Sequence, residues 1–266
     1  MGTRTRHRHQ FVRVLVSLLI AVSMAAPAFL VYVLSFSTSR FFAVSGTGFS
    51  LEWFSRALTP QWLGAFGTSI LLASIVSFGA VTIAAPAAFY RVRVGSHFVA
   101  RMIELGALVL LLVPPISLAV GYFRMYGEHS VFTLVLGHTV LAFPYAYFSL
   151  LAGFRRIDPE VMDAAELLGT SPWATMFRVM LPASRRYVLL GLVLAFLISW
   201  DESVLSIFTT DPNLVTLPKL TWESVQRERD LTPAAINAVI APFLSLAILL
   251  LFVPRRNDRK LKTDTV

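Results

Sequence analysis

The sequence contains no cysteine, which excludes a disulfide framework and any zinc or redox site built on thiolates. Charged residues are also scarce: they make up 14% of the 266 positions, whereas 56% of the positions are hydrophobic. The mean hydropathy is +0.70. A soluble domain typically has about 25% charged residues, so this composition predicts an all-α polytopic membrane protein.

The motifs of common enzyme chemistries are missing as well. A phosphate-binding loop needs a Gly-Lys pair, and none of Lys219, Lys260 and Lys262 follows a glycine. The sequence has neither a His-Glu-x-x-His nor a Gly-x-Ser-x-Gly motif. His7 and His9 lie in a basic tail, where solvation is a simpler interpretation than metal binding. We therefore expect a non-catalytic protein with no metal site and no cofactor.

Six apolar segments account for most of the chain, and each has about the 20 residues that a membrane-spanning helix requires. A tripeptide in the first segment, Ala26-Pro27-Ala28, is typical of a signal-peptidase site, so a cleaved signal peptide is an alternative to a retained span. The apolar run continues well past this site, which favours a retained span. The predicted domain covers 14–254, between basic tails at 1–13 and 255–266, with spans at about 14–36, 62–90, 103–122, 131–154, 187–208 and 234–253.

Prolines interrupt the third of these spans. Pro114 and Pro115 remove two backbone donors in the middle of the apolar run, which must kink or break the helix there. The break is either a simple packing kink or a hinge that forms a wall of a transport pathway. Pro144 lies in the fourth span.

The distribution of positive charge predicts the topology. If both termini are cytoplasmic, the inner segments contain Arg4, Arg6, Arg8, Arg13, Arg91, Arg93, Arg101, Arg155, Arg156, Arg178, Arg185, Arg186, Arg255, Arg256, Arg259, Lys260 and Lys262. The outer segments contain only Arg40, Arg56, Arg124, Lys219, Arg227 and Arg229. This bias follows the positive-inside rule, and it explains the net charge of +8 without nucleic-acid binding. The loop at 155–186 is then cytoplasmic.

This loop is predicted to form two short helices joined by a tight turn. Asp158 precedes Pro159 as a cap precedes the first helical residue, and Gly169 suits a left-handed turn. Ser171 and Pro172 repeat the start signal, and the second helix is expected to end at Leu181-Pro182. The prediction is a helical hairpin at the cytoplasmic surface.

The first of these helices is suited to protein contact. Ala164 and Ala165 leave a low surface between Asp163 and Glu166, so another protein can approach closely. A helix-turn-helix DNA reader is disfavoured because the second helix is largely apolar, with Arg178 as its one candidate for groove contact. A polar loop between two apolar runs therefore indicates a docking site for a separate protein.

Asp201 and Glu202 place two adjacent carboxylates inside the fifth apolar run. Charge at membrane depth is costly, so it usually faces a cavity or a partner. At about 1.5 Å per residue, the pair lies roughly 20 Å along the span from its cytoplasmic start. Either the pair attracts cations to a pathway, or the helix ends early and the acids are solvated or ion-paired at the outer mouth. On a continuous helix only one of them would face the pathway.

The cytoplasmic loop resembles the EAA loop of ABC importer permeases in spacing and in residue type: Asp163-Ala164-Ala165, then Gly169, then Val179-x-Leu181-Pro182. It departs from the family pattern in having Asp163 for the usual glutamate and Val179 for the usual isoleucine. The segments 35–40, 199–202, 216–218 and 233–237 resemble the spermidine/putrescine permease subfamily, in particular its second permease subunit. The resemblance implies the type I ABC importer permease fold and a place in the bacterial cytoplasmic (inner) membrane.

The resemblance also implies partners. ATP-binding subunits, which hydrolyse the ATP, would dock on the cytoplasmic side; a second permease subunit would complete a heterodimer in the lipid; and an extracytoplasmic binding protein would deliver a small solute, such as a polyamine. The ATPase-coupling loop would contain Asp163, Ala164, Ala165, Glu166, Gly169, Leu181 and Pro182, with the nearby arginines at the lipid headgroups. The substrate pathway would contain Trp200, Asp201 and Glu202, although packing is the simpler role for Trp200. A stand-alone secondary transporter or channel for a small cation is the alternative.

Overall fold

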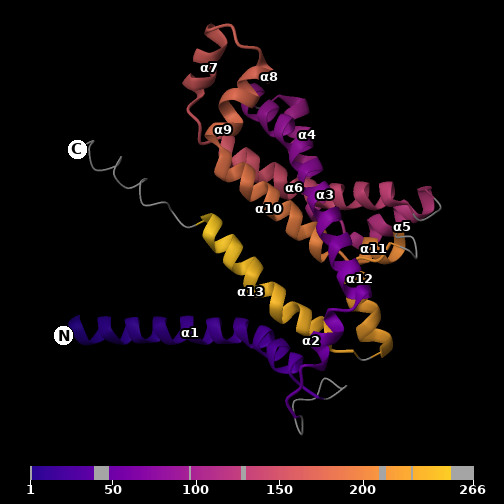
Figure 1. The fold of residues 1–266 in the computed structure, drawn as a ribbon. Helices are drawn as coiled ribbons and strands as arrows, with labels where there is room; N and C mark the ends of the chain where they lie inside the picture. The colour runs from indigo at the N-terminus through magenta and orange to yellow at the C-terminus, as the bar shows by residue number, and fades with distance from the viewer. Residues whose placement is uncertain are drawn as a thin grey trace. The chain divides into compact units, whose positions relative to one another are not determined.

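The computed structural model describes residues 2–38, 48–95, 97–126, 130–209, 214–228 and 230–252. In these residues the secondary structure is helical apart from one isolated antiparallel bridge between Ser37 and Phe49. The chain divides into two compact units, Met1–Pro60 with Glu223–Val266, and Gln61–Trp222. Figure 1 labels the helices that belong to each unit.

The first unit is built around the packing of three helices. They are α1 (Gly2–Ser35), α2 (Glu52–Ala57) and α13 (Thr232–Phe252), and a π-helical turn, η2 (Ser224–Glu228), precedes α13. Helix α13 packs against both α1 and α2. Trp53 of α2 is buried against Leu231 and Ala235, and its indole N–H donates to the Ser37 carbonyl over 2.7 Å. The start of α13 is fixed by Asp230, whose carboxylate accepts hydrogen bonds from the backbone N–H and the hydroxyl of Thr232.

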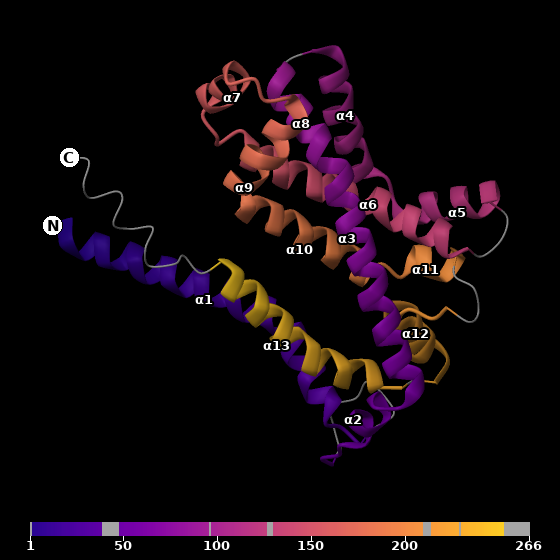
Figure 2. The same cartoon turned by 45° about the horizontal axis from the view of Figure 1, so that its top comes forward.

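The second unit contains the remaining helices. In chain order they are α3 (Pro60–Val94), α4 (Phe98–Leu112), α5 (Pro115–Tyr126), α6 (Val131–Phe154), α7 (Pro159–Leu167), α8 (Pro172–Thr175), the π-helical turn η1 (Met176–Met180), α9 (Leu181–Ala183), α10 (Arg185–Asp201), α11 (Val204–Thr209) and α12 (Leu217–Glu223). Figure 2 shows α6 and α10 running side by side, as their extensive packing requires.

Helices α6 and α10 approach closely because small residues line their interface. Gly191 faces Ala146, where an added Cβ would lie 3.5 Å from the Ala146 Cα atom. Polar atoms cross the interface too: the Ser149 hydroxyl donates to the Tyr187 carbonyl over 2.8 Å, and His138 Nδ1 lies 3.0 Å from Ser199 Oγ. Small residues and interhelical hydrogen bonds are the usual means of helix association in lipid.

Three helical segments among the described residues are long and apolar enough to cross a membrane: Val12–Ser35, Pro60–Val94 and Val131–Phe154. The number rises to five if each of two bent pairs forms one span. One pair is Phe98–Leu112 with Pro115–Met125, bent by 101°, and the other is Pro172–Ala183 with Arg185–Asp201, bent by 85°. The predicted sixth span, 234–253, falls on α13. The six-span count and the cytoplasmic location of both termini stay predictions.

Candidate coupling loop and pathway site

The loop at 155–186 begins with the capped helix that the sequence predicts. The Asp158 side chain accepts a hydrogen bond from the Glu160 N–H over 3.0 Å, and Pro159 is the first residue of α7. Gly169 follows α7 with φ +79°, a left-handed conformation that glycine adopts without steric cost. The Ser171 hydroxyl accepts from the Ala174 N–H over 3.3 Å, and Pro172 opens α8. Both helix starts and the glycine turn are confirmed.

The predicted end of the second helix at Leu181-Pro182 is confirmed to within one residue. The helix runs from α8 through the π-helical turn η1 into α9, which ends at Ala183, and the chain breaks at Ser184 before α10. Pro182 is accommodated because it lies in the first turn of α9, just after the change from π-helical to α-helical hydrogen bonding. The Ser184 hydroxyl donates to the Met180 carbonyl over 2.7 Å, and the chain turns by 85° into α10.

The surface of α7 combines small, acidic and apolar residues. Asp163 and Ala164 are exposed, whereas Ala165 is buried against the loop. The Ala165 carbonyl accepts a hydrogen bond from the Thr170 hydroxyl over 2.6 Å, which holds the turn at Gly169. Glu166 forms an ion pair with Arg93 of α3.

Large apolar side chains are also exposed on this loop, and the motifs in the sequence did not predict them. Leu167 and Leu168 are 89% and 85% exposed, and Trp173 of α8 is 62% exposed. Trp173 stacks on Phe177 with a distance of 6.4 Å between ring centroids. The sequence does contain a signal for this surface, which is the apolar pair Leu167 and Leu168 at the end of a mainly polar segment. Several exposed large apolar side chains within one loop indicate a site of protein contact.

The arginines that flank the loop have partners within the protein. Arg155 forms an ion pair of 3.3 Å with Glu104 of α4, and Arg91 of α3 pairs with the same carboxylate at 2.6 Å. The Arg156 guanidinium lies over the Tyr187 ring, 5.5 Å from its centroid. These contacts tie α3, α4 and α6 together, and the headgroup anchor expected of the arginines stays a prediction.

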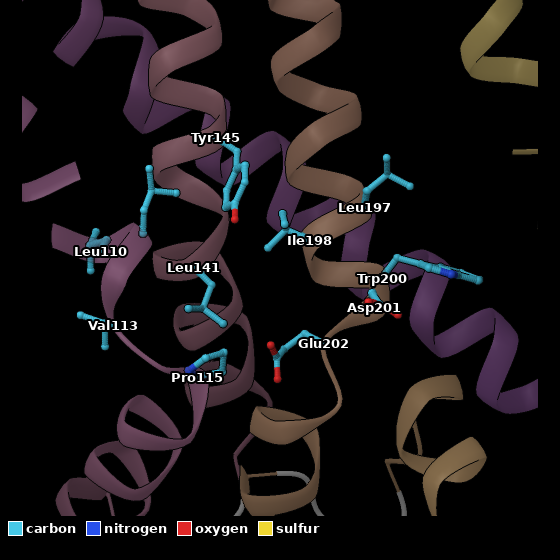
Figure 3. Close-up of a pocket in the computed structure, with 11 residues that line it drawn as sticks. Leu110, Val113, Pro115, Leu141, Tyr145, Leu197, Ile198, Trp200, Asp201 and Glu202 are labelled. Carbon is cyan, nitrogen blue, oxygen red and sulfur yellow. The ribbon is translucent and has the colours of Figure 1, made fainter. Parts of the chain in front are cut away.

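A pocket of about 600 Å³ lies among α4, α5, α6 and α10 (Figure 3). Its lining is mostly apolar, with two acidic side chains and a tyrosine at its edge: Leu110, Leu111, Val113, Pro115, Leu141, Tyr145, Leu197, Ile198, Trp200, Asp201 and Glu202. The break between α4 and α5 contributes to the wall, because Val113 is extended before Pro114 and Pro115 begins α5. The proline pair therefore shapes the pocket.

The two acidic residues of the pocket differ in their surroundings. Helix α10 ends at Asp201, and the Glu202 carboxylate accepts a hydrogen bond from the Leu205 N–H over 2.9 Å, which caps α11. No hydrogen bond or ion pair in the described part of the chain engages the Asp201 carboxylate. Helix α10 therefore does not continue past Asp201, and both carboxylates line the pocket. Among the described residues, Asp201 is thus the pocket carboxylate without a hydrogen-bond or ion-pair partner.

Trp200 has a packing role in this structure. Its ring lies edge-on to Phe66 with 5.6 Å between centroids, and it stacks on Phe196 at 5.9 Å. Figure 3 shows the indole directed away from Tyr145, whose hydroxyl points into the space between α6 and α10. Tyr145 is therefore the aromatic side chain that is better placed to meet a ligand in the pocket.

The fold is that of ABC importer membrane subunits. The chain is similar to a solved structure described as a bacterial ABC transporter involved in the import of the acidic polysaccharide alginate. The TM-score is 0.69 at 14% sequence identity, and the alignment covers 93% of this chain and 96% of the other. An amino acid ABC transporter matches with a TM-score of 0.53 at 16% identity, over 76% and 94% of the two chains.

The sequence identifies the family. Residues 80–263 match the model of the binding-protein-dependent transport system inner membrane component, and the chain belongs to this family. The putrescine transport system permease protein PotI of Escherichia coli K12 is 27% identical in an alignment of 228 residues, and the coverage is 80% of each chain. The spermidine/putrescine transport system permease protein PotC of the same strain is 26% identical over 204 residues, 75% of this chain and 77% of its own. The chain is thus a permease component of an ABC importer.

Proposed function

We propose that this permease forms half of a pathway for a small organic cation, with a polyamine as the best candidate. The observation that carries the proposal is the free Asp201 carboxylate in a pocket of about 600 Å³ that also contains Glu202 and Tyr145. A carboxylate offsets the charge of an ammonium group, and an aromatic face attracts it. The names of the relatives PotI and PotC, which refer to putrescine and spermidine, support the same substrate class.

The cytoplasmic loop supplies the energy coupling in this proposal. ATP-binding subunits contact the exposed surface of α7 and α8, where Asp163, Ala164, Leu167 and Trp173 are accessible. When ATP draws those subunits together, the loop follows, and the helices attached to it change the opening of the pathway. The turn at Gly169 and the segment at Leu181-Pro182 fix the orientation of the two short helices. The permease itself hydrolyses no ATP.

The assembly and its location follow from the same proposal. A second permease subunit completes the pathway as a heterodimer, and an extracytoplasmic binding protein delivers the solute to its outer mouth. The complex lies in the bacterial cytoplasmic membrane, with six spans in this subunit and both of its termini in the cytoplasm. The family to which the chain belongs, an inner membrane component of binding-protein-dependent systems, supports this arrangement.

The first experiment is affinity purification of the tagged protein from detergent-solubilised membranes, followed by mass spectrometry. We expect an ATPase with a Walker motif and a second permease to accompany it. The complex is then reconstituted with its binding protein, and uptake of radiolabelled putrescine and spermidine is measured with and without ATP. Recovery of the chain alone, or uptake that needs no ATPase, would favour a secondary transporter.

The Asp201 variants test the substrate class. We expect Asp201→Asn to raise the KM for polyamine uptake at least about tenfold, which corresponds to one lost charge interaction of about 1.4 kcal/mol. Glu202→Gln is the matched control, because an amide oxygen still caps α11 and the change removes the neighbouring charge. A larger effect of Glu202→Gln than of Asp201→Asn would reverse the assignment of the two carboxylates. Unchanged uptake by both variants would show that the pocket is not part of the transport pathway.

A further inference from the structure

An ion pair joins the coupling loop to a helix from an earlier part of the chain. Arg93 in the last turn of α3 and Glu166 near the end of α7 approach to 2.7 Å between Nη1 and Oε1. Their side chains are 32% and 37% exposed, so the pair is neither buried nor fully solvated. Glu166 comes directly before the exposed apolar residues Leu167 and Leu168. Its carboxylate contacts another helix, whereas their side chains are exposed.

The position of Glu166 in its helix is electrostatically unfavourable without Arg93. The carbonyl end of a helix carries partial negative charge, which disfavours an acidic side chain in the last turn and favours a basic one. Glu166 precedes the last residue of α7, and Arg93 lies in the last turn of α3. Arg93 therefore offsets the negative ends of two helices as well as the Glu166 carboxylate.

The end of α3 also meets α8 and the ion pairs of the neighbouring helices. Pro172 and Trp173 of α8 line a pocket of about 380 Å³ together with Phe89, Tyr90 and Arg93 of α3. Two residues earlier in α3, Arg91 pairs with Glu104, which also pairs with Arg155 at the end of α6. Both views show α8 beside this end of α3 (Figure 1 and Figure 2). Movement of the loop therefore has a non-covalent route into α3, and through Glu104 into α4.

We propose that Glu166 is a positioning residue that transmits the motion of the coupling loop to α3 through Arg93, and that it does not bind the ATPase. This inference rests on the proposed coupling function of the loop. The chain connects α7 directly only to α6 and, through α8 and α9, to α10, so the ion pair adds α3 to the helices that move with the loop. A partly exposed ion pair contributes little to stability, so breaking it alters coupling while the subunit stays folded.

Charge exchange tests the proposal in the reconstituted complex. We expect Glu166→Arg and Arg93→Glu each to reduce ATP-dependent uptake by roughly 2- to 30-fold, the range for residues that carry coupling between sites. The amount of copurified ATPase should stay unchanged. The double variant Arg93→Glu with Glu166→Arg restores the opposite charges and should recover most of the uptake. Stimulation of ATPase activity by loaded binding protein should be weaker in the single variants than in the wild type and in the double variant.

A neutral pair of variants provides the control. Glu166→Gln removes the ion pair without introducing repulsion, and Glu160→Gln removes a carboxylate from the first turn of the same helix, where no ion pair forms within the described residues. We expect reduced uptake for the former only. Because neither substitution reverses a charge, these two variants still test the proposal if a charge-reversed subunit fails to accumulate in the membrane.

Three results would overturn the proposal. One is wild-type uptake by Glu166→Gln, and another is a double charge exchange no better than the single variants. The third is loss of the ATPase from the Glu166→Gln complex, which would place Glu166 at the subunit interface. If the wild-type protein itself carries no ATPase, the proposed function fails instead, and the two failures are distinguished by this one measurement.

Discussion

At the residue scale, two glycines of the second unit are required for different physical reasons. A Cβ at Gly153 would lie 2.5 Å from the Tyr187 Cβ atom, so only hydrogen fits where α6 meets the start of α10. At Gly169 nothing lies within 4 Å, and the requirement comes from the backbone, whose φ is +79°. The first glycine serves packing, and the second serves the direction of the chain.

We expect Gly153→Ala to destabilise the subunit by about 1–3 kcal/mol, because overpacking forces the Tyr187 side chain or the helices apart. The measurement is the midpoint of thermal unfolding in detergent. Gly106→Ala in α4 is the matched control, since an added methyl there meets nothing within 4 Å. That control should be neutral or stabilising by about 0.5–1 kcal/mol, the usual gain from replacing a helical glycine. Equal midpoints for Gly153→Ala and the wild type would show that the two helices have room to separate.

We expect Gly169→Val to uncouple transport while the protein still reaches the membrane. A left-handed conformation costs an L-residue roughly 1–2 kcal/mol, and a β-branched side chain makes it worse, so the turn between α7 and α8 changes direction. The readouts are uptake and the stimulation of ATPase activity by loaded binding protein. Gly169→Asn is the control, because asparagine tolerates this conformation. Normal coupled uptake by Gly169→Val would contradict the role of the turn.

The roles of these residues can be predicted from the sequence to different degrees. Gly169 is recognisable because it stands between two cap-and-proline signals at Asp158 and Ser171, which are local in the chain. Gly153 was not singled out, because its neighbour Tyr187 lies on another helix and the contact depends on packing. Asp201 and Glu202 are conspicuous as charges in an apolar run. Their division into a free carboxylate and a helix cap depends on where α10 ends.

At the element scale, the break between α4 and α5 is the feature that local sequence determines most directly. The residue before a proline is driven into extended conformation, and Val113 has φ −74° and ψ 120°. The two helices diverge by 101°, which a continuous helix cannot do. Val113 and Pro115 then form part of the pocket wall beside Leu141. The break is therefore an architectural feature of the pocket.

We expect the double variant Pro114→Ala, Pro115→Ala to lower uptake while leaving the amount of protein in the membrane unchanged. Alanine supplies the missing donors and favours α-helix by about 3 kcal/mol per residue over proline, so α4 and α5 gain the means to straighten. Pro144→Ala in α6 is the control, since it removes a proline from a helix that is continuous in the structure. An unaltered KM and maximal rate in the double variant would show that the pocket wall does not depend on the bend.

The π-helical turn within the second loop helix was harder to predict than the helix starts. Helix starts depend on one cap residue and one proline, which are adjacent in sequence. The end of the second loop helix depends on the π-helical turn η1, which shifts the hydrogen-bond register so that Pro182 begins a new segment. No local residue type signals that shift. The Leu-Pro pair therefore predicted the end of the helix to within one residue but not the change in hydrogen bonding before it.

At the scale of the whole molecule, topology is the property most open to a direct test, and the absence of cysteine makes the test clean. Phe49 in the first unit is 75% exposed, and Leu167 in the coupling loop is 89% exposed. A cysteine introduced at either position would be the only thiol in the chain.

We expect a membrane-impermeant maleimide to label Phe49→Cys in spheroplasts and Leu167→Cys only in inverted vesicles. The positive-inside bias predicts that the loop at 155–186 is cytoplasmic and that the connection after the first span is outside. Leu168→Cys, 85% exposed on the same loop, serves as the control for accessibility. Labelling of both loop positions in spheroplasts would invert the topology.

The hydrogen bond between His138 and Ser199 also has a consequence for the order in which helices enter the membrane during synthesis. The two residues are 61 positions apart in the chain and both are buried at the interface of α6 and α10. At synthesis rates of about 5–20 residues per second, His138 leaves the ribosome roughly 3–12 s before Ser199 does. During that interval α6 carries an imidazole without its partner, and an unpaired polar group is costly in hydrocarbon. Stable lateral release of α6 into lipid is therefore expected to await the synthesis of α10, so that the two helices enter the bilayer as a pair.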